Sequence, residues 1–230
     1  MAEAIAERLS AVRQGIAQAA ATAGRDPAGI ILVAVSKTKP VADIRAAAAA
    51  GQLDFGENYA QELRDKMAEA ADPRLRWHFI GQLQANKVKY LAGKAALIHS
   101  VDSVKLIREI GQRAAGLKVV QDILIEVNLG GEASKSGVAE AEVGGLIEAA
   151  LEQPAVRLRG LMTMPPYFPE GEKSRPFYRR LCELRDREQA RVGDRVHLTD
   201  LSMGLSHDYP VAIAEGATLV RVGTAIFGAR

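Results

Sequence analysis

The sequence has 230 residues, of which 48% are hydrophobic and 25% are charged, as is usual for a globular protein. Its 30 lysine and arginine residues nearly balance its 28 acidic residues. The net charge of +2 therefore argues against a protein that binds nucleic acid or a charged membrane surface. Cys182 is the one cysteine, which excludes an internal disulfide and suits a reducing compartment.

The N-terminal segment predicts an amphipathic helix rather than a targeting signal. Ile5, Leu9, Val12 and Ile16 recur at helical spacing, and we expect the helix to end near Gly24. Acidic residues occur early in this segment, and no apolar stretch of the chain approaches the ~18 residues of a membrane span. We therefore expect a cytoplasmic protein with no membrane partner.

After this helix, short apolar runs typical of strands alternate with helical patterns. We expect strands near residues 30–35, 53–55, 77–80, 96–99, 121–127, 157–161, 197–201 and 218–222. We expect helices near residues 40–51, 59–67, 82–90, 103–110, 143–150, 177–189 and 208–216. Strict alternation favours a parallel sheet, and eight repeats fit a single TIM-type (β/α)8 barrel over residues 1–230, preceded by the extra helix.

A doubly wound open sheet is the alternative fold. No Gly-x-Gly-x-x-Gly follows the first strand, which weakens a dinucleotide-binding version of that sheet.

Lys37 lies at the end of the first expected strand, in Val35-Ser36-Lys37-Thr38-Lys39-Pro40. The six apolar residues before Ser36 are typical of a strand buried on both faces. Partial desolvation and the nearby Lys39 would disfavour the ammonium form of Lys37 and leave its amine able to attack a carbonyl. The alternative is an ordinary solvated lysine at a strand end.

The barrel fold would gather several polar and glycine-containing segments at the carboxyl ends of the strands, where active sites of such barrels lie. They are residues 56–59, 81–87, 128, 162–164, 202–204 and 221–224. The loops after strands seven and eight are the usual phosphate site of this fold. Ser202, Met203 and Gly204 on one loop, with Gly223 and Thr224 on the other, supply the backbone and hydroxyl donors that a phosphate needs.

Arg221 lies on the last strand, which neighbours the first strand in a closed barrel, so Arg221 and Lys37 can face one cavity. A phosphate site, an arginine and a strand-end lysine together indicate a phosphorylated aldehyde held as a Schiff base. Pyridoxal 5′-phosphate (PLP) is the obvious candidate. The alternative for Arg221 is a structural ion-pair partner.

Six stretches of the chain resemble the pyridoxal phosphate homeostasis protein family (the YggS/PROSC type), which is related to the barrel domain of alanine racemase. They are Val35–Lys37, Phe55–Asn58, His78–Lys87, Gly160–Met164, Leu201–Ser206 and Arg221–Gly228. The resemblance covers essentially the whole chain, and His78–Lys87 is its most specific stretch. Leu205, where the family pattern predicts methionine, is a conservative departure.

The resemblance implies a fold-type III PLP protein without the second β domain. Within it, Lys37 is the Schiff-base lysine and Arg221 lies beside the pyridine nitrogen. Ser202, Gly223 and Thr224 lie at the phosphate, and Asn58 and Met203 lie near the cofactor. We expect His78 to orient backbone rather than to act in catalysis. For the segment Ser134–Gly137 three interpretations stay open: a mobile lid, a second cofactor-handling patch and a simple solvated loop.

A carrier is the favoured function, with no catalytic residue and no metal. An arginine beside the pyridine nitrogen disfavours its protonation and makes the ring a weaker electron sink. The chain ends soon after the last strand, so we expect no second domain to supply an opposing base, and Tyr59 and Tyr167 are poor substitutes. We expect a monomer that stores or delivers PLP, with PLP-dependent apoenzymes as candidate partners. The alternatives are a weak amino-acid racemase and a class I aldolase-like barrel acting on a sugar phosphate.

Overall fold

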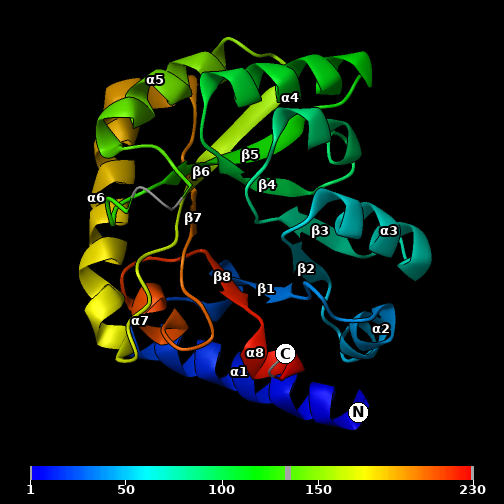
Figure 1. The fold of residues 1–230 in the computed structure, drawn as a ribbon. Coiled ribbons are helices and arrows are strands. Elements are labelled where there is room, and N and C mark those ends of the chain that lie inside the picture. Colours follow the sequence, from blue (N-terminus) through cyan, green and yellow to red (C-terminus); the bar gives the residue numbers. More distant parts are fainter. Residues whose placement is uncertain (1, 133–135, 229–230) are drawn as a thin grey trace.

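The computed structural model describes residues 2–132 and 136–228, in which eight parallel strands close into a barrel (Figure 1). The strands are β1 Ile31–Val35, β2 Asp54–Glu57, β3 Arg76–Phe79, β4 Leu97–Val101, β5 Gln121–Val127, β6 Val156–Thr163, β7 Asp200–Ser202 and β8 Leu219–Val222. Strands that follow one another in sequence pair in the barrel, and β8 closes it by pairing with β1. The predicted (β/α)8 barrel is confirmed.

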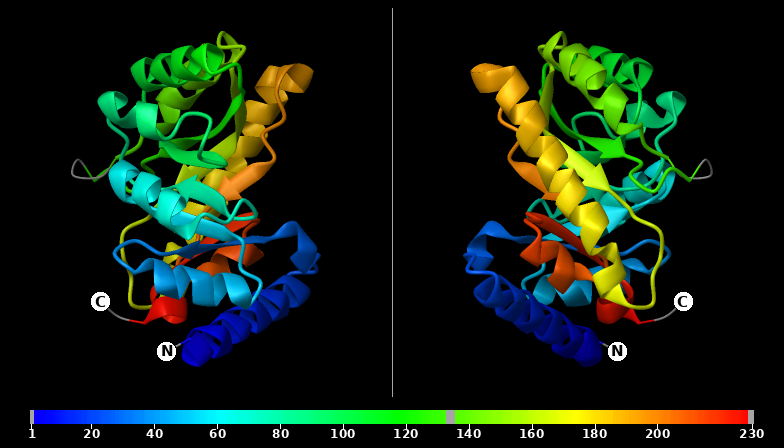
Figure 2. Two further views of the ribbon diagram at one scale, coloured as in Figure 1. Left: turned by 90° about the vertical axis from the view of Figure 1, so that its right-hand side faces the viewer. Right: turned by 90° about the vertical axis from the view of Figure 1, so that its left-hand side faces the viewer.

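The α-helices lie outside the ring of strands (Figure 1). They are α1 Ala2–Thr22, α2 Val41–Ala49, α3 Ala60–Ala70, α4 Val104–Gly116, α5 Glu140–Leu151, α6 Arg175–Val192, α7 Tyr209–Ala214 and α8 Thr224–Phe227. Figure 2 shows α1 along one side of the molecule, where it packs against α2, α7 and α8. None of the helices in the described part of the chain is long and apolar enough to span a membrane.

Two segments differ from the sequence prediction. Residues 82–90 do not contain an α-helix but the short 3₁₀ helix Ala85–Tyr90. Val88 is its one fully buried residue, so the segment has no apolar face with which packing could stabilise an α-helix. The four-residue helix α8 was not predicted, because such a short segment carries no helical periodicity.

The inside of the barrel is identified by a small apolar cluster of Val33, Leu97, Leu124, Met162 and Leu219, each from a different strand. Side chains alternate along a strand, so residues two positions away from these share the interior. The larger hydrophobic core, by contrast, lies between the strands and the helices. Polar residues that face the interior, such as His78, His99 and Ser202, are therefore buried.

Candidate functional site

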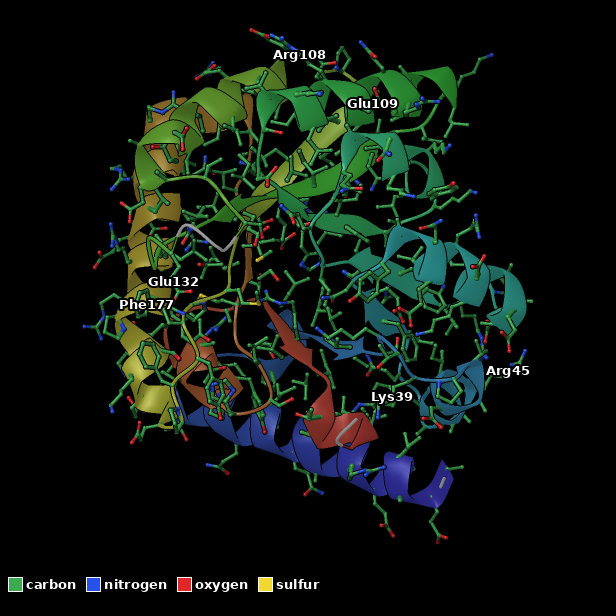
Figure 3. All side chains as sticks on the ribbon, in the orientation of Figure 1. Lys39, Arg45, Arg108, Glu109, Glu132 and Phe177 are labelled. Carbon is green, nitrogen blue, oxygen red and sulfur yellow. The ribbon has the colours of Figure 1, made fainter. Side chains whose placement is uncertain are left out.

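A cavity of about 510 Å³ lies at the carboxyl ends of the strands. Five of the predicted site residues line it: Lys37, Asn58, Arg221, Gly223 and Thr224. Further polar groups on its wall come from Lys39, Gln82, Glu126, Ser206 and His207. Lys39 lies between α2 and α8 in Figure 3. Within residues 2–132 and 136–228, no group of three or more histidine, cysteine or acidic side chains could hold a metal ion.

Lys37 is half-buried in a tight turn that directly follows β1. The Lys39 N–H group donates a hydrogen bond of 3.0 Å to the Ser36 carbonyl oxygen and closes this turn. Lys37 and Lys39 therefore reach the same cavity from a single short loop.

Arg221 lies inside the barrel with only 3% of its surface exposed. Its Nη1 donates to the Ser202 hydroxyl at 2.5 Å, and its Nη2 donates to the Thr163 carbonyl oxygen at 3.0 Å. Burial lowers the pKa of the guanidinium from its ordinary value. These two bonds orient the guanidinium, which is also part of the cavity wall.

Ser202 does not line the cavity. It pairs with Met162 in the sheet, faces the barrel interior and is fully buried. Arginine can only donate, so the Ser202 hydroxyl accepts from Arg221, and its oxygen also lies 2.8 Å from His99 Nδ1. Met203 is also fully buried, in the hydrophobic core outside the barrel interior.

The hydrogen bonds continue from His99 through the interior to the opposite end of the barrel. His99 Nε2 lies 2.9 Å from His78 Nδ1, and His78 Nε2 lies 3.0 Å from Asp54 Oδ1. Asp54 also accepts two hydrogen bonds from Arg76. Burial tends to raise the pKa of Asp54, but the bonds from Arg76 and His78 outweigh it and the pKa lies below its ordinary value.

The donor order in this chain is fixed at both ends, because arginine only donates and an ionised aspartate only accepts. His78 therefore donates to Asp54 through Nε2, and the Ser202 hydroxyl accepts from Arg221 at the other end of the chain. Burial lowers the pKa of His99 well below its ordinary value, and the charges of His78 and Arg221 act in the same direction. His78 thus serves the internal hydrogen-bond chain rather than the cavity wall.

Ser206, four positions after Ser202, places its hydroxyl on the cavity wall. Its Oγ accepts from the backbone N–H groups of Gly223 at 3.2 Å and Ala225 at 3.4 Å, and it lines the cavity beside Thr224. The Leu205 N–H group donates to Asp208 at 2.7 Å and holds the loop in place. The sequence analysis quoted Ser206 within a family stretch but assigned it no role.

Two residues of the cavity wall each have a buried oxygen atom that accepts no hydrogen bond from the described residues. Asn58 Oδ1 and Glu126 Oε2 are buried without a hydrogen-bond partner among the described residues. Burial raises the pKa of Glu126, although the hydrogen bond from Ser136 partly offsets it. Gly81 lets its loop approach Asn58 closely, because a Cβ atom at Gly81 would lie 2.2 Å from the Asn58 carbonyl oxygen. Glu126 was not predicted as a site residue.

The predicted segment Ser134–Gly137 is only partly described. Ser134 and Lys135 lie outside the described residues, whereas the Ser136 hydroxyl donates to Glu126 Oε1 at 2.8 Å. Of the two tyrosines considered as bases, Tyr167 lines the cavity and packs against the His207 ring at 4.8 Å. Tyr167 is 72% exposed, and Tyr59, which is 62% exposed, is not part of the wall.

The chain matches the model of the family described as alanine racemase, N-terminal domain, over residues 8–230. It is 50% identical over 224 residues to the pyridoxal phosphate homeostasis protein of Aquifex aeolicus, with 97% of each chain covered. It is 48% identical over 227 residues to the protein of the same name from Pseudomonas aeruginosa, with 98% of this chain and 96% of that chain covered.

The structure is similar to PipY of Synechococcus elongatus PCC7942, which has been solved with PLP bound and without PLP. The TM-score is 0.86 at 36% sequence identity, and the match covers 97% of this chain and 100% of PipY.

Proposed function

Since the chain belongs to the pyridoxal phosphate homeostasis protein family, we propose that it binds PLP in the cavity described above and acts in PLP homeostasis. One observation carries this proposal. A single cavity joins a lysine amine, a buried guanidinium, and a group of backbone N–H and hydroxyl donors. These groups suit, in turn, the aldehyde, the pyridine ring and the phosphate of PLP.

Lys37 is the residue that we assign to the covalent link. PLP, when bound, would supply an aldehyde, and the Lys37 amine would bond to its carbon with loss of one water molecule. Gly223 and Thr224 would bind the phosphate together with Ser206, which we assign in place of Ser202. Asn58 Oδ1, buried without a partner among the described residues, would accept a hydrogen bond from a ring substituent.

Arg221 would face the pyridine nitrogen and would keep that nitrogen unprotonated, because arginine holds its own proton and a second positive charge beside it is costly. This supports a carrier without robust turnover. The name shared by the curated relatives supports the same role. We further propose a cytoplasmic monomer that delivers PLP to apoenzymes. Met203, buried in the outer core, would support the loop after β7 rather than contact PLP.

The test is an absorption spectrum of the protein with PLP, followed by borohydride reduction and peptide mapping. We expect a band near the violet edge and a reduced pyridoxyl group on Lys37. Lys37→Ala should abolish the borohydride-trapped attachment while phosphate-anchored PLP still binds. A protein that stays colourless and unmodified after incubation with PLP would overturn the proposal and favour the aldolase-like barrel.

Carrier and racemase are separated by a second measurement. A racemase exchanges the α-hydrogen of an amino acid with solvent, whereas a carrier does not. Incubation of the PLP-loaded protein with L-alanine in D₂O should therefore leave the α-hydrogen in place, as followed by proton NMR. Rapid exchange that disappears in Lys37→Ala would make the protein an enzyme.

A further inference from the structure

The turn that carries Lys37 has an unfavourable backbone conformation. Thr38 has a φ angle of 64°, in the left-handed region that β-branched residues rarely adopt. Such a conformation persists only where the surroundings hold it in place. Two hydrogen bonds from outside the turn do so, one on each side of Lys37.

The first bond holds the residue after Lys37. Glu62 on α3 accepts a hydrogen bond of 2.6 Å from the Thr38 N–H group. Lys66, one helical turn further along α3, lies 2.7 Å from the same Glu62 oxygen. The carboxylate is therefore held in place from both directions.

The second bond holds the residue before Lys37. Lys66 Nζ donates to the Ser36 carbonyl oxygen at 2.6 Å and to Glu57 Oε1 at 2.8 Å. The Ser36 hydroxyl donates to the same Glu57 oxygen at 2.6 Å. We call Glu57, Glu62 and Lys66 the anchor cluster. Together they form hydrogen bonds with both neighbours of Lys37 in the chain, Ser36 and Thr38.

The anchor cluster does not line the cavity. Gly56 faces the barrel interior, where a Cβ atom would lie 3.0 Å from a Val33 methyl group, so the next residue, Glu57, faces outward toward α3. Glu57 is fully buried, and its Oε2 has no hydrogen-bond partner within the described residues. Burial raises the pKa of Glu57 despite its bonds to Lys66 and Ser36.

A buried ion pair is weak evidence for stability, because desolvation offsets most of the attraction. An apolar contact would hold α3 against β2 at lower cost. What the cluster supplies, and an apolar contact could not, is four directional bonds to the two residues beside Lys37 and to one another. A long lysine side chain reaches a defined point only when its backbone is fixed.

We propose that Glu57, Glu62 and Lys66 are positioning residues that hold the Lys37 turn, so that the Lys37 amine meets the aldehyde of a ligand whose phosphate is anchored at the loops after β7 and β8. This inference rests on the proposed function. It concerns the covalent step alone: the carbon–nitrogen bond that Lys37 forms with loss of water, and not the noncovalent binding of the phosphate and ring.

The experiment compares two ligands that differ only at the reacting carbon. PLP can react with Lys37, whereas 4′-deoxypyridoxine 5′-phosphate has no aldehyde. Glu62→Ala should slow the borohydride-trapped modification of Lys37 by PLP about tenfold to a hundredfold, since a misplacement of ~1 Å can cost that much. Its affinity for the deoxy analogue should stay within a factor of about two of the wild-type value.

The Glu62 side chain is partly exposed, so its replacement should leave the fold intact, which circular dichroism can check. Lys66→Met keeps much of the aliphatic side chain. Once its fold is verified, it should slow the trapping of PLP more than Glu62→Ala does, again with little change in affinity for the deoxy analogue. Glu69→Ala is the matched control, because Glu69 is an exposed acid on the same helix and should leave both ligands unaffected.

If Glu62→Ala lowered the affinity for the deoxy analogue as much as it slowed trapping by PLP, the cluster would support the cavity as a whole, and the inference would be overturned. Trapping at the wild-type rate would overturn it as well. A wild-type protein that binds neither ligand would instead overturn the proposed function, and the inference with it.

Discussion

The serine that ends β7 and the serine in the loop after it have separate tasks, although only three residues lie between them. Ser206 lies on the cavity wall, and Ser202 lies inside the barrel between Arg221 and His99. Ser206→Ala should weaken the binding of PLP by about 1 kcal/mol, a roughly fivefold loss of affinity, because one neutral hydrogen bond usually contributes that much. Spectrophotometric titration measures this loss, and titration with inorganic phosphate should show a similar one.

Ser202→Ala should act mainly on stability. It leaves His99 Nδ1 and one Arg221 N–H group buried without a partner, which should lower the free energy of unfolding by about 1–3 kcal/mol. Urea denaturation measures this change. A Ser202→Ala protein of wild-type stability that binds inorganic phosphate less tightly than Ser206→Ala would restore Ser202 to the phosphate site.

The sequence could locate most of the cavity wall because strand ends converge in a barrel whatever the details of packing. Lys37, Asn58 and Arg221 were predicted on this ground and line the cavity. Ser202 lies within β7, one residue past the predicted end of that strand at residue 201, and it does not line the cavity. A shift of one residue moves a side chain to the other face of a strand, and the apolar pattern of so short a strand cannot fix its end.

At the scale of elements, Asp208 connects α6, the loop after β7 and α7. It is buried, and it accepts hydrogen bonds from the Ser174 hydroxyl, the Tyr178 hydroxyl and the Leu205 N–H group at 2.9, 2.7 and 2.7 Å. Asp208→Ala leaves all three donors unpaired and should cost about 2–4 kcal/mol of unfolding free energy. It should also lower the affinity for PLP, because the loop that carries Ser206 loses the hydrogen bond from Leu205 to Asp208.

Tyr178→Phe is the control for Asp208→Ala, since it removes only one of the three bonds. It should cost about 1 kcal/mol and leave PLP affinity unchanged. Urea denaturation and PLP titration of both variants test the comparison. If Asp208→Ala is no more harmful than Tyr178→Phe in either measurement, Asp208 does not organise the loop.

The order of the elements was predictable because each buried strand forms an apolar run and each covering helix has a 3.6-residue period. The helix α1 shows the same: Ile5, Leu9, Val12 and Ile16 were predicted to face inward, and all four are buried. The hydrophobic period did not predict the 3₁₀ helix Ala85–Tyr90. Its conformation depends on neighbours such as α3 and α4, which packing and not periodicity brings beside it.

At the scale of the whole molecule, the hydrogen-bond chain from Arg76 at the surface to the buried Arg221 crosses the barrel from one end to the other. It could not be predicted from the sequence, because it needs the register of several strands at once. His78 faces the interior only because it pairs with Gly56, and His99 only because it lies two residues beyond Leu97. The chain makes the stability of the barrel sensitive to acid.

His99 determines the direction of this sensitivity. Its pKa in the folded protein lies well below the ordinary 6.5, owing first to burial, so the folded protein binds no proton there when the unfolded chain does. Its contribution to stability is therefore fully present above pH 6.5 and falls by up to about 1.4 kcal/mol per pH unit below it. The lowered pKa of Asp54 acts in the same direction, but only near and below its ordinary 3.8.

Glu57 and Glu126 act in the opposite direction, because their raised pKa values let the folded protein bind protons more tightly than the unfolded chain. A variant therefore has to isolate His99. The unfolding free energy of wild type, His99→Asn and the exposed control His197→Asn should be measured at pH 7 and pH 5 by urea denaturation. His99→Asn should be less stable at pH 7, yet should lose about 2 kcal/mol less than the other two on acidification. The same loss in all three proteins would show that His99 takes up a proton without unfolding the barrel.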